Sequence, residues 1–294
     1  FAAVKLGVFL YKIAVYKSVF KYKISFSALH ILFELLRRSI PFALFAIFER
    51  IYYQIDVLML SLLSSENSIG LYQASMRLVM GMMIIPFVFS SALYPVFSRF
   101  GKADHDKLKM YAAKALDILL IFSLPLLIIF FVFAEEILVL VFGPKAIPSV
   151  RVFQILSFSI PFKFYSFIFG MTLTALDRQS KRVLTVGICA LLNVVLNLIL
   201  IPQFDFLGAG IATLISELTI FSLYQRDLRF IIKPGANVYR IAASSLSLVI
   251  ISYLLSDSLF TAVIVGIIFY TFVLILLRVV NREDYNFLRG IFAK

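Results

Sequence analysis

The chain has 294 residues, of which 62% are apolar and 15% are charged, and its mean hydropathy is +1.00. Soluble globular domains carry about 45–50% apolar and about 25% charged residues, so a soluble fold, disorder, collagen and coiled coil are excluded. The net charge of +12 comes from basic residues scattered between apolar runs, a pattern typical of membrane topology and not of nucleic-acid binding. The composition therefore predicts an integral membrane protein.

The N-terminal residues 1–17 are apolar, but they contain Lys5 and Lys12 and lack the small-residue cleavage site of a signal peptide. Because the chain begins with Phe1, we expect this stretch to be the end of a truncated transmembrane helix in a fragment of a longer protein. Residues 18–38 follow as a basic linker on the cytoplasmic side. The last third of this linker is amphipathic and is expected to lie along the membrane interface.

Apolar runs of the roughly 20 residues that a spanning helix needs recur about eight times in the rest of the chain. The runs are continuous and do not alternate, which favours helices over a barrel. No loop much exceeds about 20 residues, so no soluble catalytic domain is expected. The sequence predicts an all-α, polytopic membrane helix bundle that is not an enzyme. The expected spans are 39–63, 71–97, 116–134, 152–176, 182–201, 207–225, 239–256 and 259–280.

Lys and Arg are distributed unevenly between the connections of these spans. Alternate connections carry three to five basic residues, whereas the intervening ones carry none or two. Basic loops stay in the cytoplasm. We therefore expect a multi-pass protein of the cell membrane with its basic loops and its C-terminus in the cytoplasm.

Several predicted spans contain ionisable residues, which are costly in lipid unless they face a partner or an aqueous cavity. On the first full span, Glu49, Tyr53 and Asp56 fall within an arc of about 60°, and Arg50 lies beside them. Polar stripes on four further spans indicate a shared cavity. These stripes consist of Gln73, Arg77, Gly81 and Ser91; Ser159, Lys163, Ser166 and Gly170; Cys189, Asn193 and Asn197; and Gly210, Thr213, Glu217 and Tyr224.

Each stripe has more than one interpretation. Asp56 and Arg77 are expected to form either a structural ion pair or a coupling or gating site. Glu217 has either a coupling role or a packing role as a protonated, hydrogen-bonded side chain. Amide and small residues at other positions favour helix packing. These packing residues are Asn193, Asn197, Gly208 and Gly210.

Arg50 and Lys163 lie near the middle of their spans, in stripes that offer unequal countercharge. An anionic ligand in a water-filled cavity explains such cations, because Arg binds phosphate through two hydrogen bonds and Lys binds it as a point charge. No nucleotide-binding, hydrolase or metalloprotease motif is present. The single Cys189 and two histidines do not make a zinc site. No cofactor and no metal are therefore expected.

A set of short motifs occurs in a particular order along the chain. It consists of Pro41 with Asp56, G-x-Y-x-A at 70–74, A-x-x-P-x-x-S at 92–98, Asn193 with Asn197, Ile201-Pro202, G-A-x-x-A-T at 208–213, and Glu217. In this order, over residues 39–226, the chain resembles the polysaccharide-biosynthesis flippases of the multidrug/oligosaccharidyl-lipid/polysaccharide exporter superfamily.

The resemblance implies two six-helix lobes, of which 39–226 is the second, while 227–294 adds a basic loop and a terminal pair of helices. A missing N-terminal lobe precedes them. It also implies that an isoprenoid-diphosphate-linked saccharide is flipped from the cytoplasmic to the outer leaflet by alternating access, for cell-surface polysaccharide biosynthesis. The substrate-binding residues would be Arg50, Arg77, Lys163, Tyr53 and Gln54, and the coupling or gating residues Glu49, Asp56 and Glu217.

Two alternatives remain beside this hypothesis. A cation-coupled multidrug exporter of the same superfamily would need acidic residues to dominate the cavity. A non-transporting scaffold of a polysaccharide assembly complex is the second. A membrane glycosyltransferase or ligase would need a catalytic carboxylate pair in a sizeable outer loop, and the outer loops are too short for it. The expected partners are lipid-linked saccharide, a bilayer with anionic headgroups, the missing lobe, and polymerase and glycosyltransferases of the same pathway, but no nucleic acid.

Overall fold

The structure is a computed structural model, and it describes residues 7, 11, 29–229, 237–255 and 259–279. The expected truncated helix at 1–17 (apart from Gly7 and Tyr11), the first part of the 18–38 linker, and residues 230–236, 256–258 and 280–294 lie outside the described residues. The chain divides into two compact units, Phe1–Ile40 and Pro41–Lys294. All the site residues considered below belong to the second unit.

The predicted all-α class is confirmed, because the described residues form helices and contain no strand. Five helical stretches are long and apolar enough to cross a membrane, or six if one bent pair is counted as a single span. The helices are α2 (Leu29–Leu63), α3 (Glu66–Gly81), α4 (Ile84–Ala103), α5 (His105–Val132), α6 (Ala134–Phe142), a 3-10 helix (Pro144–Ser149), α7 (Val150–Ser157), α8 (Ser159–Ala175), α9 (Gln179–Phe204), α10 (Phe206–Leu228), α11 (Val238–Leu254) and α12 (Leu259–Leu276).

Two of the eight predicted spans fall outside that group of five or six. The span 39–63 lies in α2, which carries three charged residues, Glu49, Arg50 and Asp56, in its apolar part. The span 239–256 corresponds to α11, an apolar helix of 17 residues. The total of eight spans therefore stays a prediction.

Two predicted spans are built from broken helices. The span 71–97 is divided between α3 and α4 by a turn at Met82 and Met83. The span 152–176 is divided between α7 and α8, and the stretches Pro144–Ser157 and Ser159–Ala175 meet at an angle of 41°. Apolar periodicity alone does not reveal such breaks, because the residues on both sides remain hydrophobic.

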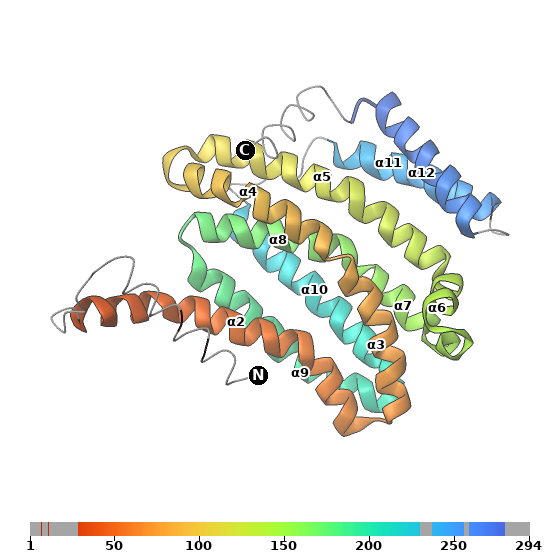
Figure 1. Cartoon of the computed structure of the whole chain (residues 1–294), viewed down its shortest axis with the longest axis horizontal. Helices are drawn as coiled ribbons and strands as arrows, with labels where there is room; N and C mark the ends of the chain where they lie inside the picture. Colours follow the sequence, from red (N-terminus) through yellow and green to blue (C-terminus); the bar gives the residue numbers. More distant parts are fainter. Residues whose placement is uncertain (1–6, 8–10, 12–28, 230–236, 256–258, 280–294) are drawn as a thin grey trace. The chain divides into compact units, whose positions relative to one another are not determined.

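Within the second unit, α8 packs against α4, α5 and α10, and α10 packs in turn against α9, α7 and α3 (Figure 1). Small residues allow two of these close approaches. A Cβ on Gly101 of α4 would lie 2.2 Å from the Ala175 carbonyl oxygen at the end of α8, and a Cβ on Gly210 of α10 would lie 2.6 Å from the Val152 side chain of α7. A side chain at either position would push the helices apart.

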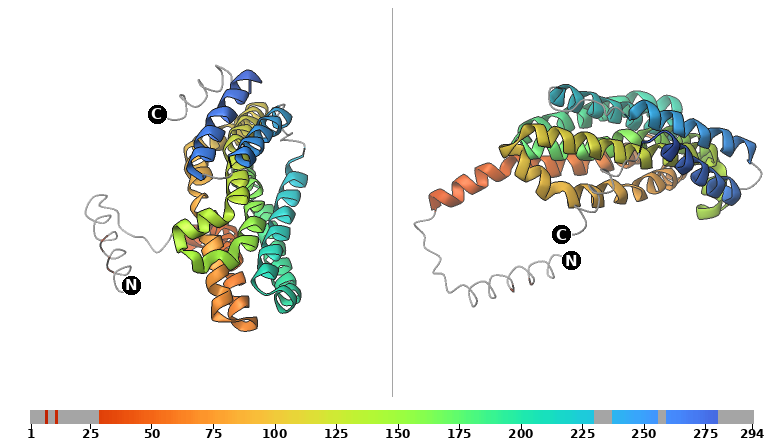
Figure 2. Two further views of the ribbon diagram at one scale, coloured as in Figure 1. Left: turned by 90° about the vertical axis from the view of Figure 1, so that its right-hand side faces the viewer. Right: turned by 90° about the horizontal axis from the view of Figure 1, so that it is seen from above.

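The terminal helices α11 and α12 pack on each other, and α11 packs on α5 (Figures 1 and 2). Their smaller apolar cluster includes Leu120, Leu248 and Leu274, and the Tyr270 hydroxyl donates to the Ile121 carbonyl at 3.0 Å. In each of the five span candidates, no more than half of the residues in the most apolar part are buried inside the protein. The outward apolar side chains are those expected at a lipid-facing surface.

Two turns at one end of the helices are joined by hydrogen bonds. Asp205, between α9 and α10, has a φ of +53°, an uncommon conformation for a residue with a side chain. Its carboxylate accepts a hydrogen bond from Ser64, which lies in the turn between α2 and α3. It accepts another, at 2.6 Å, from Ser68 in the first turn of α3. These bonds hold the end of α2 beside α9 and α10, and so position the polar faces described next.

Candidate functional site

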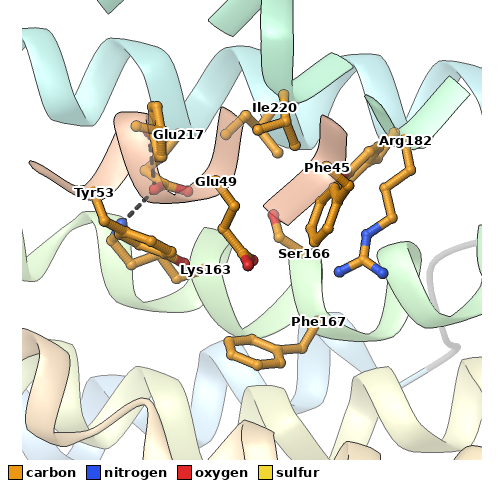
Figure 3. Close-up of a pocket in the computed structure, with 12 residues that line it drawn as sticks. Phe45, Glu49, Tyr53, Lys163, Ser166, Phe167, Arg182, Glu217 and Ile220 are labelled. Atoms are coloured by element: carbon orange, nitrogen blue, oxygen red, sulfur yellow. Dashed lines mark hydrogen bonds and ion pairs between the residues drawn. The ribbon is translucent and has the colours of Figure 1, made fainter. Parts of the chain in front are cut away.

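Polar side chains of α2, α8, α9 and α10 surround a cavity of about 70 Å³, which we call the inner cavity (Figure 3). The sequence places these residues there because each stripe follows the helical repeat of its own helix. The cavity holds water-sized groups and not a whole sugar in this conformation. Its lining consists of Phe45, Glu49, Tyr52, Tyr53, Lys163, Ser166, Phe167, Arg182, Val186, Glu217, Ile220 and Tyr224.

At one side of the inner cavity, Lys163 of α8 forms an ion pair with Glu217 of α10, and both side chains are 3–4% exposed. The Tyr52 hydroxyl donates a second hydrogen bond to Glu217 at 3.0 Å, and the Lys163 ammonium lies 5.7 Å from the centre of the Tyr53 ring. The stripe of Lys163 on α8 contains no carboxylate, and the countercharge comes from Glu217 on α10. A helical wheel shows which way Lys163 points on α8 but not which residue of α10 meets it. The alternative of a protonated Glu217 that only packs is likewise replaced by this ion pair.

On another side of the same cavity, the Arg182 guanidinium lies 3.7 Å from the centre of the Phe45 ring and donates to the Thr174 hydroxyl at 3.3 Å. Its Nε is buried and has no partner in the structure. Glu49 lies between Arg182 and the Lys163–Glu217 pair (Figure 3). The cavity thus contains a cation that retains hydrogen-bonding capacity.

Sequence reasoning missed Arg182, because it was grouped with the basic residues of a loop. The signal was present: Arg182 and Val186 continue the stripe of Cys189, Asn193 and Asn197 by two further helical turns. Extending that stripe to the first turn of α9 identifies Arg182 as an inward-facing residue.

A second group of polar residues, the Asp56 cluster, lies between α2, α3, α9 and α10. The Asp56 carboxylate accepts hydrogen bonds from Tyr72 at 2.6 Å, from Thr213 at 2.7 Å and from the Asn197 amide at 2.7 Å. Asn197 also donates to Asn193 at 3.0 Å. The structural ion pair between Asp56 and Arg77 that the sequence left open is therefore not formed. Three neutral donors from other helices occupy the carboxylate instead.

The Asp56 cluster is the part of the described chain with the donor chemistry for a small hard cation. No group of three or more His, Cys, Asp and Glu residues that is suited to a metal occurs in the described residues. The cluster instead offers the Asp56 carboxylate, the Thr213 hydroxyl and the Asn197 Oδ1, which is buried without a hydrogen-bond partner. Oxygen donors of this kind suit hard cations.

Arg50 and Arg77 line another pocket, which is more open, has a volume of about 370 Å³ and is called the arginine pocket below. Arg77 donates to Gln73 at 3.2 Å, and no carboxylate of the described residues is within ion-pairing distance of either arginine. The predicted single cavity is thus divided, because Lys163 lines a separate cavity and Tyr53 borders both. The remaining lining residues are Tyr53, Gln54, Val57, Tyr72, Gln73, Met76 and Met80.

The MatE family profile matches residues 41–199, which is more than half of the chain. The chain belongs to the MatE family. This assignment confirms the resemblance to the multidrug/oligosaccharidyl-lipid/polysaccharide exporter superfamily that the ordered motifs indicated.

Two curated relatives of this MatE chain come from Haloferax volcanii. The probable low-salt glycan biosynthesis flippase Agl15 is 25% identical over 166 residues, which are 56% of this chain and 35% of Agl15. The probable flippase AglR is 27% identical over 169 residues, again 56% of this chain and 35% of the relative. The chain thus matches these relatives over about a third of their length.

Solved structures share the fold of this MatE chain. The lipid II flippase MurJ in an inward closed conformation superposes with a TM-score of 0.71 and 18% identity, over 93% of this chain and 60% of MurJ. An outward-facing multidrug resistance MATE transporter superposes with a TM-score of 0.58 and 19% identity, over 76% of this chain and 54% of that protein. At these identities the likeness establishes the fold alone.

Proposed function

We propose that this chain is part of a transporter that moves an isoprenoid-diphosphate-linked saccharide from the cytoplasmic to the outer leaflet of the cell membrane. The observation that carries the proposal is the arginine pocket, where Arg50 and Arg77 lie together without a carboxylate partner among the described residues. Guanidinium groups without a carboxylate partner are costly inside a membrane unless they face water or bind an anion, and a water-filled hollow that contains two of them attracts an anion. The relatives Agl15 and AglR, which are named as probable flippases, support the same activity.

The chemistry of the arginine pocket suits a diphosphate with a sugar attached. Each planar guanidinium of Arg50 and Arg77 offers paired donors to phosphate oxygens. The amides of Gln54 and Gln73 and the hydroxyl of Tyr53 line the same hollow and provide donors and acceptors for sugar hydroxyls. Lys163 is not part of this proposed phosphate site, because its ammonium is paired with Glu217 in this conformation.

The carboxylates supply a means of coupling. Asp56 is 3% exposed and is held by neutral donors alone, so a proton or a small cation that reaches it changes the charge shared by α2, α9 and α10. Glu49 and Glu217 line the inner cavity, where a change of pairing with Arg182 or Lys163 would accompany alternating access. We propose Asp56 as the coupling residue, and Glu49 and Glu217 as gating residues.

We propose that the basic loops and the C-terminus face the cytoplasm, as the distribution of Lys and Arg indicates. The segment 39–226 would then be one transporter lobe that works with a further lobe and receives its substrate from glycosyltransferases of the same pathway. The proposed activity requires no bond to be made or broken, so the protein would not be an enzyme.

The test uses the product of the complete gene in proteoliposomes with a fluorescent lipid-linked saccharide. The double variant Arg50→Gln/Arg77→Gln should lower the flipping rate by at least about tenfold, because charge-assisted hydrogen bonds contribute about 1.5–3 kcal/mol each. Arg151→Gln is the matched control, since Arg151 is an exposed arginine that lines neither the inner cavity nor the arginine pocket. Flipping by the double variant at the rate of the control would contradict the proposal.

The second candidate is a cation-coupled multidrug exporter. The fold that this chain shares with the multidrug MATE transporter is compatible with that function. A cationic drug would use Glu49 in the inner cavity and would gain nothing from Arg50 or Arg77. Drug efflux that survives Arg50→Gln/Arg77→Gln and is lost in Glu49→Gln, without saccharide flipping by the unaltered protein, would favour this candidate.

A further inference from the structure

The arginine pocket and the Asp56 cluster share one side chain. Tyr72 of α3 lines the arginine pocket, and its hydroxyl donates to the Asp56 carboxylate at 2.6 Å. Tyr72 is 1% exposed, so this connection is shielded from bulk water. On α2, Arg50 and Val57 border the pocket and Asp56 directly precedes Val57, so the carboxylate lies on a neighbouring face of the same helix. One tyrosine side chain therefore separates a pocket with two cations from a buried carboxylate.

The charges on the other side of the arginine pocket balance one another. Tyr53 separates the pocket from the inner cavity, whose lining contains two carboxylates and two cations. One carboxylate and one cation of that lining form the ion pair between Lys163 and Glu217. Among the described residues, Asp56 instead accepts its hydrogen bonds from neutral groups. Asp56 therefore places a negative charge without a paired cation beside the arginine pocket.

The sign of the interaction between the two sites follows from these charges. In the empty pocket, the guanidinium groups of Arg50 and Arg77 favour the negative charge of Asp56 across Tyr72. A diphosphate in the pocket offsets the guanidinium charges, so the carboxylate and the bound anion then repel each other. Unit charges about 10 Å apart, at an effective dielectric constant of about 20, change a binding constant by about tenfold. We expect an effect of this order, because a single side chain separates the sites.

We propose that the arginine pocket and Asp56 are linked through Tyr72, so that an anion in the pocket and a cation at Asp56 bind cooperatively. The inference rests on the proposed function, because the anion is the diphosphate of the proposed substrate and Asp56 is the proposed coupling residue. The linkage is reciprocal, since each ligand raises the affinity for the other by the same factor. The saccharide carrier and the coupling cation therefore occupy this part of the transporter together and are not exchanged for each other. A cationic drug in the same pocket would show the opposite sign.

Binding of farnesyl diphosphate to the product of the complete gene in nanodiscs measures the linkage, because this probe carries a diphosphate without a saccharide. Asp56→Asn removes the negative charge, as a bound cation would, and should raise the affinity about tenfold. The matched control is Asp117→Asn, which removes a partly buried carboxylate of α5 that lines neither the arginine pocket nor the inner cavity. The affinity for uncharged farnesol should be the same in the unaltered protein and in both variants.

Tyr72→Phe tests Tyr72 as a positioning residue. The variant keeps the ring in the wall of the pocket and removes the donor that offsets part of the Asp56 charge, so the affinity for farnesyl diphosphate should fall about threefold. In the Asp56→Asn background the same substitution should leave the affinity unchanged, whereas a merely structural role of Tyr72 would lower it in both backgrounds. Tyr270→Phe is the matched control, because Tyr270 is a buried tyrosine whose hydroxyl donates to the Ile121 carbonyl.

An affinity of Asp56→Asn for farnesyl diphosphate that equals or falls below that of Asp117→Asn would overturn the linkage. Thermal unfolding curves show which variants are folded. If Asp56→Asn does not fold, Tyr72→Phe decides, and an affinity equal to that of Tyr270→Phe would overturn the linkage. A probe that needs both arginines of the pocket but binds independently of Asp56 would contradict the linkage and leave the proposed function intact. A probe that binds equally well when both arginines are replaced by glutamine would contradict the proposed function as well.

Discussion

Two carboxylates in this protein are equally buried but differently held. Asp56 and Glu217 are each 3% exposed and lie on helices that face each other, α2 and α10. Glu217 is paired with the Lys163 ammonium and accepts one hydrogen bond from Tyr52. Asp56 accepts all its hydrogen bonds from neutral groups: a tyrosine, a threonine and an asparagine. The two carboxylates are therefore equally buried, but only Glu217 has a positively charged partner.

The difference separates two roles that a buried carboxylate has in a membrane. A paired carboxylate such as Glu217 carries no net charge with its partner, so it stabilises one arrangement of α8 and α10 and resists change. A carboxylate held only by neutral donors has no cation beside it, so a proton or a small cation that reaches it meets no competing positive charge. Coupling is therefore assigned to Asp56, and a substitution at each carboxylate site tests the assignment.

The largest expected effect follows from removing the cation of the Glu217 pair. Lys163→Met leaves a carboxylate buried without countercharge, so the free energy of unfolding should fall by about 3–5 kcal/mol. Chemical unfolding in detergent micelles measures it. The double variant Lys163→Met/Glu217→Met should recover most of the loss, because neither charge then remains. A single variant as stable as the unaltered protein would show that the pair does not hold α8 to α10.

A smaller effect is expected at Asp56, where no cation is lost. Asp56→Ala leaves the donors Tyr72 and Asn197 without their acceptor, at a cost of about 1–3 kcal/mol for each unsatisfied group. Asp56→Asn keeps an acceptor oxygen and removes the charge, so its free energy of unfolding should change by less than about 1 kcal/mol. The same variant should abolish any dependence of transport on an ion gradient.

The outcome for Asp56→Asn decides the comparison. Near-native stability with lost coupling would separate Asp56 from Glu217 as proposed. If Asp56→Asn instead unfolded as easily as Lys163→Met, both carboxylates would be structural, and the ion-gradient measurement in proteoliposomes would then give no separate information about coupling.

The sequence predicts the helices well but not the partners of their polar residues. Continuous apolar runs identify the positions of the predicted spans, and the stripes identify their inward faces, because both depend on one helix at a time. Lys163 and Glu217 were each recognised as inward-facing, yet nothing within one helix shows that they meet. Their pairing depends on how α8 and α10 pack side by side, which is a tertiary property.

The Asp56–Arg77 alternative failed for a related reason. Opposite charges on successive spans make an ion pair the simplest expectation, but Tyr72, five residues before Arg77 on α3, donates its hydroxyl to Asp56 instead. The turn at Met82 and Met83 that ends α3 is also hidden from an apolar pattern. Arg182 differs from the Asp56 pairing and the α3 turn, because the sequence does show that it continues the α9 stripe. It was overlooked because it lies near a basic loop.

The smallest effect is expected at a third carboxylate, Asp104, which lies between the span candidates and is more exposed than Asp56 and Glu217. It caps α5 by accepting a hydrogen bond from the Lys107 backbone N–H at 3.0 Å, and this bond lowers the pKa of Asp104 below its usual value. The carboxylate form therefore stabilises the first turn of α5 above the usual pKa of an aspartate. That contribution is lost as the pH falls through the lowered pKa. The protection factor of the Lys107 amide, which is its exchange rate relative to the intrinsic rate at the same pH, should fall in acid in the unaltered protein but not in Asp104→Asn, which keeps an acceptor and does not titrate. The same acid dependence in both proteins would show that the cap does not depend on charge, and that water screens even a well-placed carboxylate once it is partly exposed.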